Sequence, residues 1–311
     1  MPQKVILDTD IGDDIDDAYA LALILASDEF DLVGVTTVFG NTAARARQAQ
    51  TILKLAGRQD VPVAAGCGAT LSPRPGVGEP DLPGGQVSLT ARSRDLLDDI
   101  RPRQDVAALT AAELPALSAM HGVDFLIGAI MDGDGDVIPV TIGAMTNLAM
   151  ALVKEPRIAS RIPRIVSMAG CYFGPAAEWN VRCDPVAAAI VFGSGVPVTA
   201  VGLDVTTRCV IAEARLARLA ACERPVAQNL ARATEAWAGR LPCLHDPLAV
   251  ETVFRPDLVA MKTGTVTVEL EGAVTYARTV FEERASGPHS VGAEVNSAEA
   301  VDLWLDRVVS L

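Results

Sequence analysis

Six aspartates lie within ten positions near the start of the chain, directly after the short apolar run Val5–Leu7. They are Asp8, Asp10, Asp13, Asp14, Asp16 and Asp17. Carboxylates this close together repel one another unless a cation neutralises them, and oxygen ligands of this type suit hard cations such as Ca²⁺ and Mg²⁺. The alternative is a solvated acidic loop whose aspartates cap a helix, but surface loops seldom follow a buried strand so tightly. The cluster therefore predicts a divalent-metal site at the first strand-to-helix turn.

Further polar residues stand next to other apolar segments of the chain. They are Asn41 after residues 32–38, Thr146 after residues 137–142, Glu178-Trp179-Asn180 after residues 165–169, and His245-Asp246-Pro247 before an apolar helical segment. In an open α/β sheet, ligands bind beyond the carboxyl ends of the strands. We therefore expect these residues to converge with the aspartates on one crevice.

Each of these residues also has a purely structural interpretation. Asn41 and Thr146 could cap the helices that follow them. Asp246 could be a helix N-cap followed by proline at the first helical position. His245 could be a hydrogen-bonded structural histidine, and residues 178–180 could form an ordinary loop. Their common position at strand ends, in a chain with only three histidines, favours a shared site.

Short β-branched runs alternate with longer helical patterns along the chain. The expected strands are Val5–Leu7, Leu32–Val38, Val61–Ala64, Val137–Ile142, Ile165–Ala169 and Val198–Leu203. The expected helices are Ala18–Ala26, Thr42–Leu55, Val123–Met131, Leu148–Val153, Pro185–Phe192 and Ala212–Cys222. This alternation predicts an α/β fold with a mainly parallel open sheet and helices on both faces.

The last third of the chain has a different pattern. Thr263–Leu270 and Thr275–Glu282 flank Glu271-Gly272, which predicts a small C-terminal hairpin. The segment Ala298–Val309 is expected to close the chain as a helix.

One long irregular tract, residues 66–120, interrupts the alternation and is rich in proline and glycine. Loops of this length inside a compact domain are usually functional lids or excursions. The tract has too few apolar residues to form a core of its own, so we expect a single domain over residues 1–311.

Composition excludes several classes of protein. The chain has 311 residues, 50% of them hydrophobic, which indicates a large buried core. A formal net charge of -13 and the lack of a basic stripe argue against nucleic-acid binding. No segment resembles a membrane span or a signal peptide, and the six cysteines show neither a C-x-x-C pair nor metal-ligand spacing. These features predict a cytoplasmic protein with reduced thiols.

The polar motifs, taken in chain order, resemble those of the inosine–uridine-type nucleoside hydrolases. The matching segments are Asp8-Thr-Asp10-Ile-Gly12, Asp16-Asp17-Ala18, Val38-Phe-Gly-Asn41, Met145-Thr146-Asn147, Met168-Ala-Gly170, Glu178-Trp-Asn180 and His245-Asp246-Pro247. The resemblance spans nearly the whole chain. It implies the Rossmann-like nucleoside hydrolase fold and hydrolysis of the N-glycosidic bond of purine or pyrimidine ribonucleosides to base and ribose. It also implies a homodimer or homotetramer.

The resemblance further implies a bound Ca²⁺. Its ligands would be Asp10, Asp17, the main-chain carbonyl of Thr146, and Asp246, with ribose hydroxyls and a water completing the shell. A site of six to eight oxygens suits Ca²⁺ better than Mg²⁺. Asp8 would orient this site from behind, as metal ligands commonly require.

The same resemblance assigns roles around the substrate. Asp10 would act as general base on the water, and His245 as the acid that protonates the departing base. Cleavage would pass through an oxocarbenium-like sugar stabilised by nearby carboxylates. The ribose would be contacted by Asp16, Asn41, Glu178 and Asn180. Met168 and Trp179 would line the pocket and pack against the nucleoside.

The chain departs from the family pattern at two points. Two extra residues separate Gly12 from the Asp16-Asp17 pair, so Asp13 and Asp14 are alternatives for the roles of that pair. We favour the later pair because Ala18 and the residues after it continue as the expected helix. The loop after Met168 also lacks the asparagine often found there, and Tyr172 or Phe173 could occupy its space.

Other interpretations of the acidic motif fit less well. Haloacid-dehalogenase-like phosphatases expect Thr or Val where Gly12 stands, and an EF-hand expects Glu where Tyr19 stands. A non-catalytic, Ca²⁺-dependent nucleoside- or sugar-binding protein is the alternative from another class. It would keep the metal ligands and lose the acid or the base, whereas both Asp10 and His245 are present.

Overall fold

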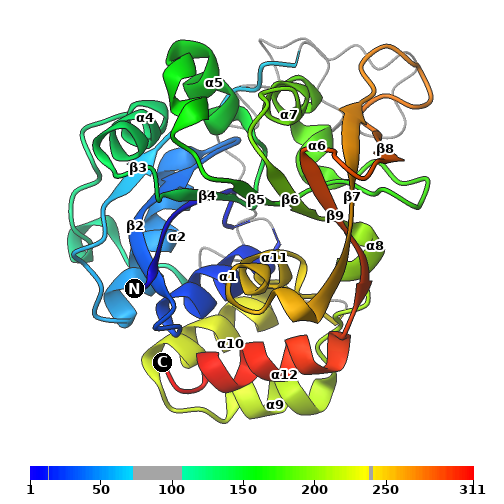
Figure 1. The fold of residues 1–311 in the computed structure, drawn as a ribbon. Helices are drawn as coiled ribbons and strands as arrows, with labels where there is room; N and C mark the ends of the chain where they lie inside the picture. Colours follow the sequence, from blue (N-terminus) through cyan, green and yellow to red (C-terminus); the bar gives the residue numbers. More distant parts are fainter. Residues whose placement is uncertain (13, 73–106, 238–240) are drawn as a thin grey trace.

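The computed structural model describes residues 1–12, 14–72, 107–237 and 241–311 of the chain (Figure 1). Its described residues form a nine-stranded sheet with the order β3-β2-β1-β4-β5-β6-β9-β7-β8. Strands β1 to β6 and β9 run parallel, whereas β7 is antiparallel to both β8 and β9. The strands are β1 Gln3–Thr9, β2 Phe30–Thr37, β3 Val63–Ala65, β4 Ile138–Thr141, β5 Ile165–Met168, β6 Val198–Val201, β7 Val259–Val268, β8 Thr279–Glu283 and β9 His289–Val295.

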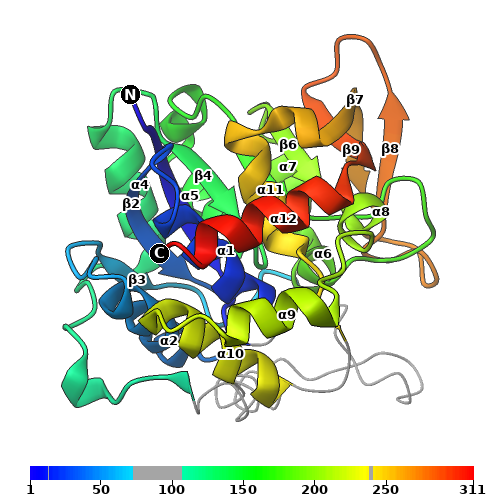
Figure 2. The same ribbon diagram turned by 90° about the horizontal axis from the view of Figure 1, so that it is seen from below.

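Helices cover both faces of this sheet. They are α1 Asp16–Leu25, α2 Thr42–Leu55, α4 Gly122–Asp132, α5 Thr146–Lys154, α6 Trp179–Cys183, α7 Pro185–Phe192, α8 Leu203–Thr206, α9 Glu213–Ala220, α10 Pro225–Trp237, α11 His245–Phe254 and α12 Ser297–Val308. Figures 1 and 2 show α4, α5 and α7 on one face and α1, α11 and α12 on the other. The mainly parallel α/β architecture expected from the sequence is confirmed.

Each face has its own hydrophobic core. Leu126, Leu148 and Val191 belong to the core under α4, α5 and α7. On the opposite face, Tyr19 of α1 packs against Trp304 of α12 with ring centroids 4.6 Å apart and ring planes tilted by 50°, and the indole donates to the Tyr19 carbonyl at 3.2 Å. Burial of such aromatic pairs supplies much of the stabilisation of a core. The two packed faces hold the sheet rigidly, so the strand ends are fixed in space.

The structure corrects the sequence expectations at several elements. Strand β9 and helix α10 were not expected, and α8 begins at Leu203, where a strand was expected to end. The predicted hairpin exists as β7 and β8, but residues 269–278 connect the strands, so Glu271-Gly272 is not a two-residue turn. Strand β9 carries His289, Gly292 and Glu294, which weaken a strand pattern, and in the structure it is paired with β6 and β7 on either side.

The long irregular tract is only partly described. Residues 66–72 and 107–120 contain little regular structure beyond the short 3-10 helix Ala111–Glu113. The rest of the expected lid, residues 73–106, lies outside the described residues.

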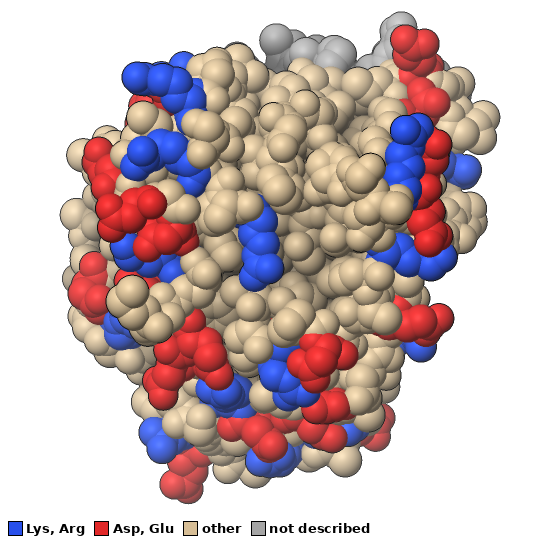
Figure 3. All heavy atoms as spheres, in the orientation of Figure 1, with Lys and Arg blue, Asp and Glu red and all other residues tan. Residues whose placement is uncertain are grey.

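Acidic and basic side chains are interspersed on the face shown in Figure 3, with no extended basic stripe on that face. Exposed ion pairs such as Arg255 with Glu299 and Arg215 with Asp302 are of the kind that adds little stability individually. Within the parts of the chain that the structure describes, no helix combines the length and apolar character needed to cross a membrane.

Candidate functional site

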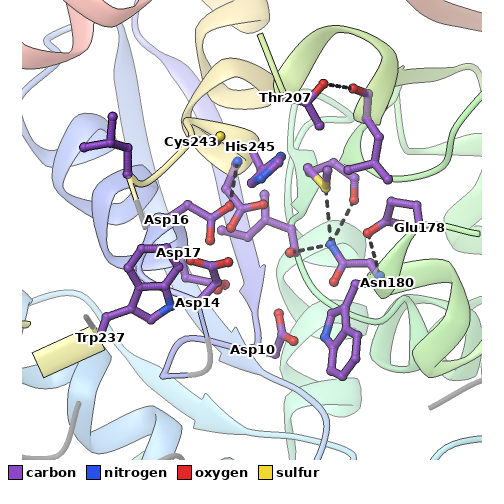
Figure 4. A pocket seen from close by; sticks show the side chains of 16 residues that line it. Asp10, Asp14, Asp16, Asp17, Glu178, Asn180, Thr207, Trp237, Cys243 and His245 are labelled. Carbon is purple, nitrogen blue, oxygen red and sulfur yellow. Dashed lines mark hydrogen bonds between the residues drawn. The ribbon is translucent and has the colours of Figure 1, made fainter. Parts of the chain in front are cut away.

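A cavity of about 440 Å³ opens beyond the carboxyl ends of β1, β4 and β5. Figure 4 shows Asp14, Asp16 and Asp17 on one side, Glu178 and Asn180 on the other, and Asp10 between them. Nine of the residues expected at the site line this cavity, namely Asp10, Asp16, Asp17, Met168, Glu178, Trp179, Asn180, His245 and Asp246. Most of the polar residues expected to converge from separate strand ends therefore lie around one cavity, whereas Asn41 and Thr146 do not line it.

Three of these carboxylates form a compact group suited to a metal ion. Asp16 and Asp17 lie in the first turn of α1, and Asp246 lies in the first turn of α11, which packs against α1. Each offers an oxygen within 4.8 Å of the others, and the Asp246 backbone N–H donates to Asp16 Oδ2 at 3.3 Å. The positive ends of two helix dipoles thus favour negative charge at this point.

Burial raises the pKa of all three carboxyls well above its usual value, and repulsion among neighbouring aspartates raises it further. Asp10 is one of the carboxylates that repel each of the three. Several buried carboxylates without enough positive charge nearby are unfavourable unless a cation neutralises them. The donor set therefore fits a hard divalent cation with oxygen ligands.

The turn that carries Asp10 is held by a buried arginine. The Arg45 guanidinium of α2 donates to the carbonyls of Asp10, of Ile11 at 3.1 Å, and of Phe39 at 2.6 Å. Its charge also lowers the pKa of Asp17, against the larger opposing effect of burial. Arg45 was not predicted from the sequence. The signal was present, because Arg45 lies four residues before Ala49 and so falls on the buried face of the expected helix.

Opposite Asp10 the chain approaches too closely for a side chain. A Cβ atom at Gly143, in the turn after β4, would lie 2.6 Å from Asp10 Oδ1. Glycine at this position therefore lets the turn before α5 lie directly against Asp10.

Asp8 lies behind the cavity and does not line it. Its Oδ1 accepts from Thr36 Oγ1 at 2.6 Å and from Asn147 Nδ2 at 2.8 Å, and burial raises its pKa to about 7. The Asn147 side chain also accepts from the Cys67 backbone N–H at 2.7 Å. Asp8 thus connects β1, β2 and the start of α5, as a positioning role would require.

Two expected site residues are placed away from the cavity lining. The Asn41 side chain accepts from the Ala44 N–H at 3.0 Å and caps α2, which is its structural interpretation. Thr146 is buried at the start of α5, where its hydroxyl donates to Asp184 Oδ2 at 2.7 Å. Met145 and not Thr146 is the N-cap of α5, so the capping interpretation of Thr146 is wrong.

Glu178 and Asn180 are fixed by the short helix α6. The Glu178 carboxylate accepts from the backbone N–H groups of Asn180 at 2.7 Å, Val181 at 3.0 Å and Gly170 at 3.1 Å. These bonds oppose the effect of burial, which raises the pKa of Glu178. The Asn180 amide donates to the Ile142 carbonyl at 2.8 Å, which fixes the orientation of its side chain. The neighbouring Trp179 is 42% exposed in the cavity wall.

His245 is the histidine that lines the cavity, and its ring is oriented by a buried hydroxyl. Nδ1 lies 2.8 Å from Thr206 Oγ1, and Thr206 is fully buried in α8. His121 caps α4, and His289 lies in β9 between α7 and β7. Asp246 follows His245 inside α11, whose N-cap is Leu244, so the N-cap interpretation of Asp246 is wrong.

The sequence matches the family model described as inosine-uridine preferring nucleoside hydrolase over residues 5–305. The chain belongs to this family. It is 33% identical to the inosine-uridine preferring nucleoside hydrolase of Leishmania major, over 99% of this chain and 95% of that protein. It is also 33% identical to the pyrimidine-specific ribonucleoside hydrolase RihA of Shewanella woodyi, over 99% and 95%. The solved purine-preferring ribonucleoside hydrolase of Gardnerella vaginalis aligns with a TM-score of 0.83, at 27% identity over 99% and 98%.

As a member of this nucleoside hydrolase family, the chain is a hydrolase acting on ribonucleosides. The family is metal-dependent, and the group formed by Asp16, Asp17 and Asp246 could hold a metal ion. This group contains Asp16 in place of Asp10, which was the expected ligand, although Asp10 lines the same cavity.

The two extra residues of the first motif bring another carboxylate to the nucleoside hydrolase cavity. Asp14 lines it, and its carboxylate accepts from the Ile15 N–H at 2.7 Å. Asp13 lies outside the described residues. Among the described residues, the later pair, Asp16 and Asp17, is grouped with Asp246.

Sequence reasoning missed one wall of the cavity, formed by Thr207 and the largely apolar side chains of Leu203, Trp237, Leu241 and Cys243. These residues come from α8, the end of α10 and the segment before α11, which carry no motif. Tyr172 and Phe173, considered for the space of the missing asparagine, are not among the cavity-lining residues. The Tyr172 hydroxyl donates to the Ala169 carbonyl at 2.7 Å, and Phe173 packs edge-on against Phe281.

Proposed function

We propose that the protein hydrolyses the N-glycosidic bond of ribonucleosides to free base and ribose with Ca²⁺ as its cofactor. The observation that carries this proposal is the single cavity in which buried carboxylates, an oriented histidine and an apolar aromatic wall face one another. A hydrophilic floor suits a sugar, and an apolar wall suits a planar base.

Four groups would hold the Ca²⁺, namely Asp10, Asp17, the carbonyl of Thr146, and Asp246. Support comes from the buried position of the three aspartates and from their mutual repulsion, which a divalent cation would relieve. Bound there, Ca²⁺ would bind ribose hydroxyls and make a nearby water more acidic.

Asp10 would accept a proton from the attacking water. It is 3% exposed, lies between the two sides of the cavity, and is fixed by Arg45 through its own carbonyl. A general base must be held within hydrogen-bond reach of the proton that it removes, and a rigid turn meets this need.

Asp16, Asn41, Glu178 and Asn180 would bind the ribose. Carboxylates close to the sugar ring also stabilise the positive charge that develops on an oxocarbenium-like transition state. Glu178 suits this role because three backbone N–H groups hold its carboxylate in one orientation.

His245 would donate a proton to the departing base. Its Nδ1 is engaged by Thr206, so we assign Nε2 as the atom that donates. Met168 and Trp179 would pack against the nucleoside, and both line the cavity.

The apolar wall of the cavity is compatible with both purine and pyrimidine bases. Similar proteins differ on this point, being named as inosine-uridine preferring, pyrimidine-specific and purine-preferring enzymes. The wall of Trp179, Trp237 and Leu241 offers apolar contact to either kind of base.

We also infer a cytoplasmic enzyme that forms a homodimer or homotetramer, folds as one domain over residues 1–311, and serves nucleoside catabolism and salvage. The six cysteines all lie within the described residues and form no disulfide, which supports the assignment to a reducing compartment.

The test is an assay of free ribose from inosine, adenosine, guanosine, uridine and cytidine, with and without a chelator. We expect ribose release from at least one nucleoside and its loss on chelation. Tight nucleoside binding without ribose release would instead indicate a binding protein.

A further inference from the structure

Asp184 is a fully buried aspartate that the proposed chemistry does not use. It lies between α6 and α7, outside the cavity lining, and its carboxylate accepts hydrogen bonds from three separate segments. These are the Thr146 hydroxyl of α5, the backbone N–H groups of Leu71 and Ser72 after β3, and the Ala187 N–H of its own helix.

The two oxygens of this carboxylate have different partners. Oδ2 accepts from Thr146 Oγ1 and from the Leu71 N–H, both at 2.7 Å. Oδ1 accepts from the N–H groups of Ser72 and Ala187, both at 3.1 Å. The cap of α7 therefore uses one oxygen, and the contact with Thr146 uses the other.

The Thr146 contact completes a set of restraints on the turn between β4 and α5. Gly143 allows the start of this turn to lie against Asp10. On the far side, the Asn147 amide donates to Asp8 and to the Thr37 carbonyl at 3.0 Å. Asp184 accepts from the hydroxyl of Thr146, which lies between Gly143 and Asn147 in the chain. The buried carboxylates of Asp8 and Asp184 therefore restrain the peptide units on either side of Thr146.

We propose that Asp184 is a positioning residue for the cation site, acting through the Thr146 hydroxyl to fix the Thr146 carbonyl. This inference rests on the proposed function, in which that carbonyl is a Ca²⁺ ligand. If the Thr146 carbonyl becomes ordered only when Ca²⁺ binds, the entropy lost in that ordering weakens the binding of Ca²⁺. A role restricted to capping α7 would affect stability and leave the affinity for Ca²⁺ unchanged.

Two variants separate these roles. In Asp184→Asn, the amide oxygen can still accept from Ser72 and Ala187, while the amide nitrogen replaces Oδ2 and can accept neither from the Leu71 N–H nor from the Thr146 hydroxyl. In Thr146→Val, the shape is kept and only the hydroxyl contact is lost. Thr146→Ser keeps the hydroxyl and is the matched control.

The measurement is Ca²⁺ titration of the metal-depleted full-length protein by calorimetry, without nucleoside. Loss of groups that orient metal ligands typically weakens metal binding by about 10–100-fold. We expect Asp184→Asn and Thr146→Val to raise the Kd for Ca²⁺ by about tenfold or more, and Thr146→Ser to stay near the unchanged protein. Thermal unfolding of the metal-free variants reports the separate cost of a weakened cap.

The outcomes distinguish the two proposals. If the unchanged protein binds no Ca²⁺, the proposed cation site is refuted, and the role of Asp184 with it. If it binds Ca²⁺ and both variants bind equally well, the role of Asp184 alone is refuted, even where their melting temperatures fall. Should Asp184→Asn fail to fold, the comparison of Thr146→Val with Thr146→Ser decides the question.

Discussion

Glu251 lies in α11 with a fully buried side chain, and within the described residues neither of its carboxyl oxygens has a hydrogen-bond partner. Burial raises the pKa of this carboxyl well above its ordinary value of 4.5, although Arg255 opposes the shift. A buried polar group without a partner costs about 1–3 kcal/mol relative to an apolar group of similar shape. We therefore predict that Glu251→Met stabilises the fold by about 1–3 kcal/mol at neutral pH.

The sign of the pH dependence follows from the raised pKa. The folded state keeps the Glu251 proton at pH values where the unfolded chain has lost it, so the free energy of unfolding falls as pH rises from about 4.5. It continues to fall until the pH passes the folded-state pKa. The advantage of Glu251→Met should thus be smallest near pH 4.5 and grow as the pH rises.

Thermal and urea unfolding at several pH values would measure this effect. Glu251→Gln removes the titratable group and keeps a polar side chain. The pH dependence of its free energy of unfolding should therefore match that of Glu251→Met. Glu235→Gln, at an exposed position on α10, is the control and should change little. A Glu251→Met protein that is less stable than the unchanged protein at neutral pH would show that the carboxyl has a partner and would refute the reasoning.

Three further predictions concern catalysis and stability. Asp10→Asn should lower kcat by about 10²–10⁴-fold with a normal circular dichroism spectrum, because the amide cannot accept a proton; near-normal kcat would exclude Asp10 as the base. His245→Ala should slow natural nucleosides by about 10²-fold and spare p-nitrophenyl riboside, whose leaving group needs no proton; an equal loss on both would give His245 a structural role. Burial lowers the pKa of His289, whose Nδ1 accepts from the Val266 N–H at 2.8 Å, so its contribution to stability is complete above pH 6.5 and is lost as the pH falls below 6.5. His289→Gln should therefore flatten the decline of unfolding free energy below pH 6.5, and an unchanged slope would contradict this assignment.

The local pattern of the sequence was sufficient to predict the strand ends and the polar residues on them. The buried run of β1 followed by aspartates predicted an acidic site at the first strand-to-helix turn, although the helix begins at Asp16 and not at the expected Ala18. The family resemblance added Asp246, which lies in the first turn of α11 and is grouped with Asp16 and Asp17. The rule that a parallel sheet binds ligands beyond its carboxyl ends predicted the location of the site, and the resemblance predicted which residues complete it. The packing of α1 against α11 was not predicted and is seen only in the structure.

Residues that act through long-range packing could not be predicted in the same way. Arg45 is more than 30 residues from Asp10 and Ile11, and Asp184 is 38 residues from Thr146; the bonds are made to backbone carbonyls and to a hydroxyl. Trp237 reaches the cavity from the end of α10, a helix that was not expected although its buried Val226 and Leu230 have helical spacing. Asn41 is a different case. It belongs to a segment that resembles a family motif, and in the structure its side chain caps α2, so the sequence pattern fitted both interpretations.

The central claim is that the acidic cluster holds a Ca²⁺ that ribonucleoside hydrolysis requires. The direct measurement is ribose release by metal-depleted protein before and after addition of Ca²⁺, with the bound metal quantified in the same samples and Asp246→Asn as the matched variant. We predict no release without metal, recovery on adding about one equivalent of Ca²⁺, and no recovery in Asp246→Asn. Full activity in protein shown to contain no metal would contradict the claim.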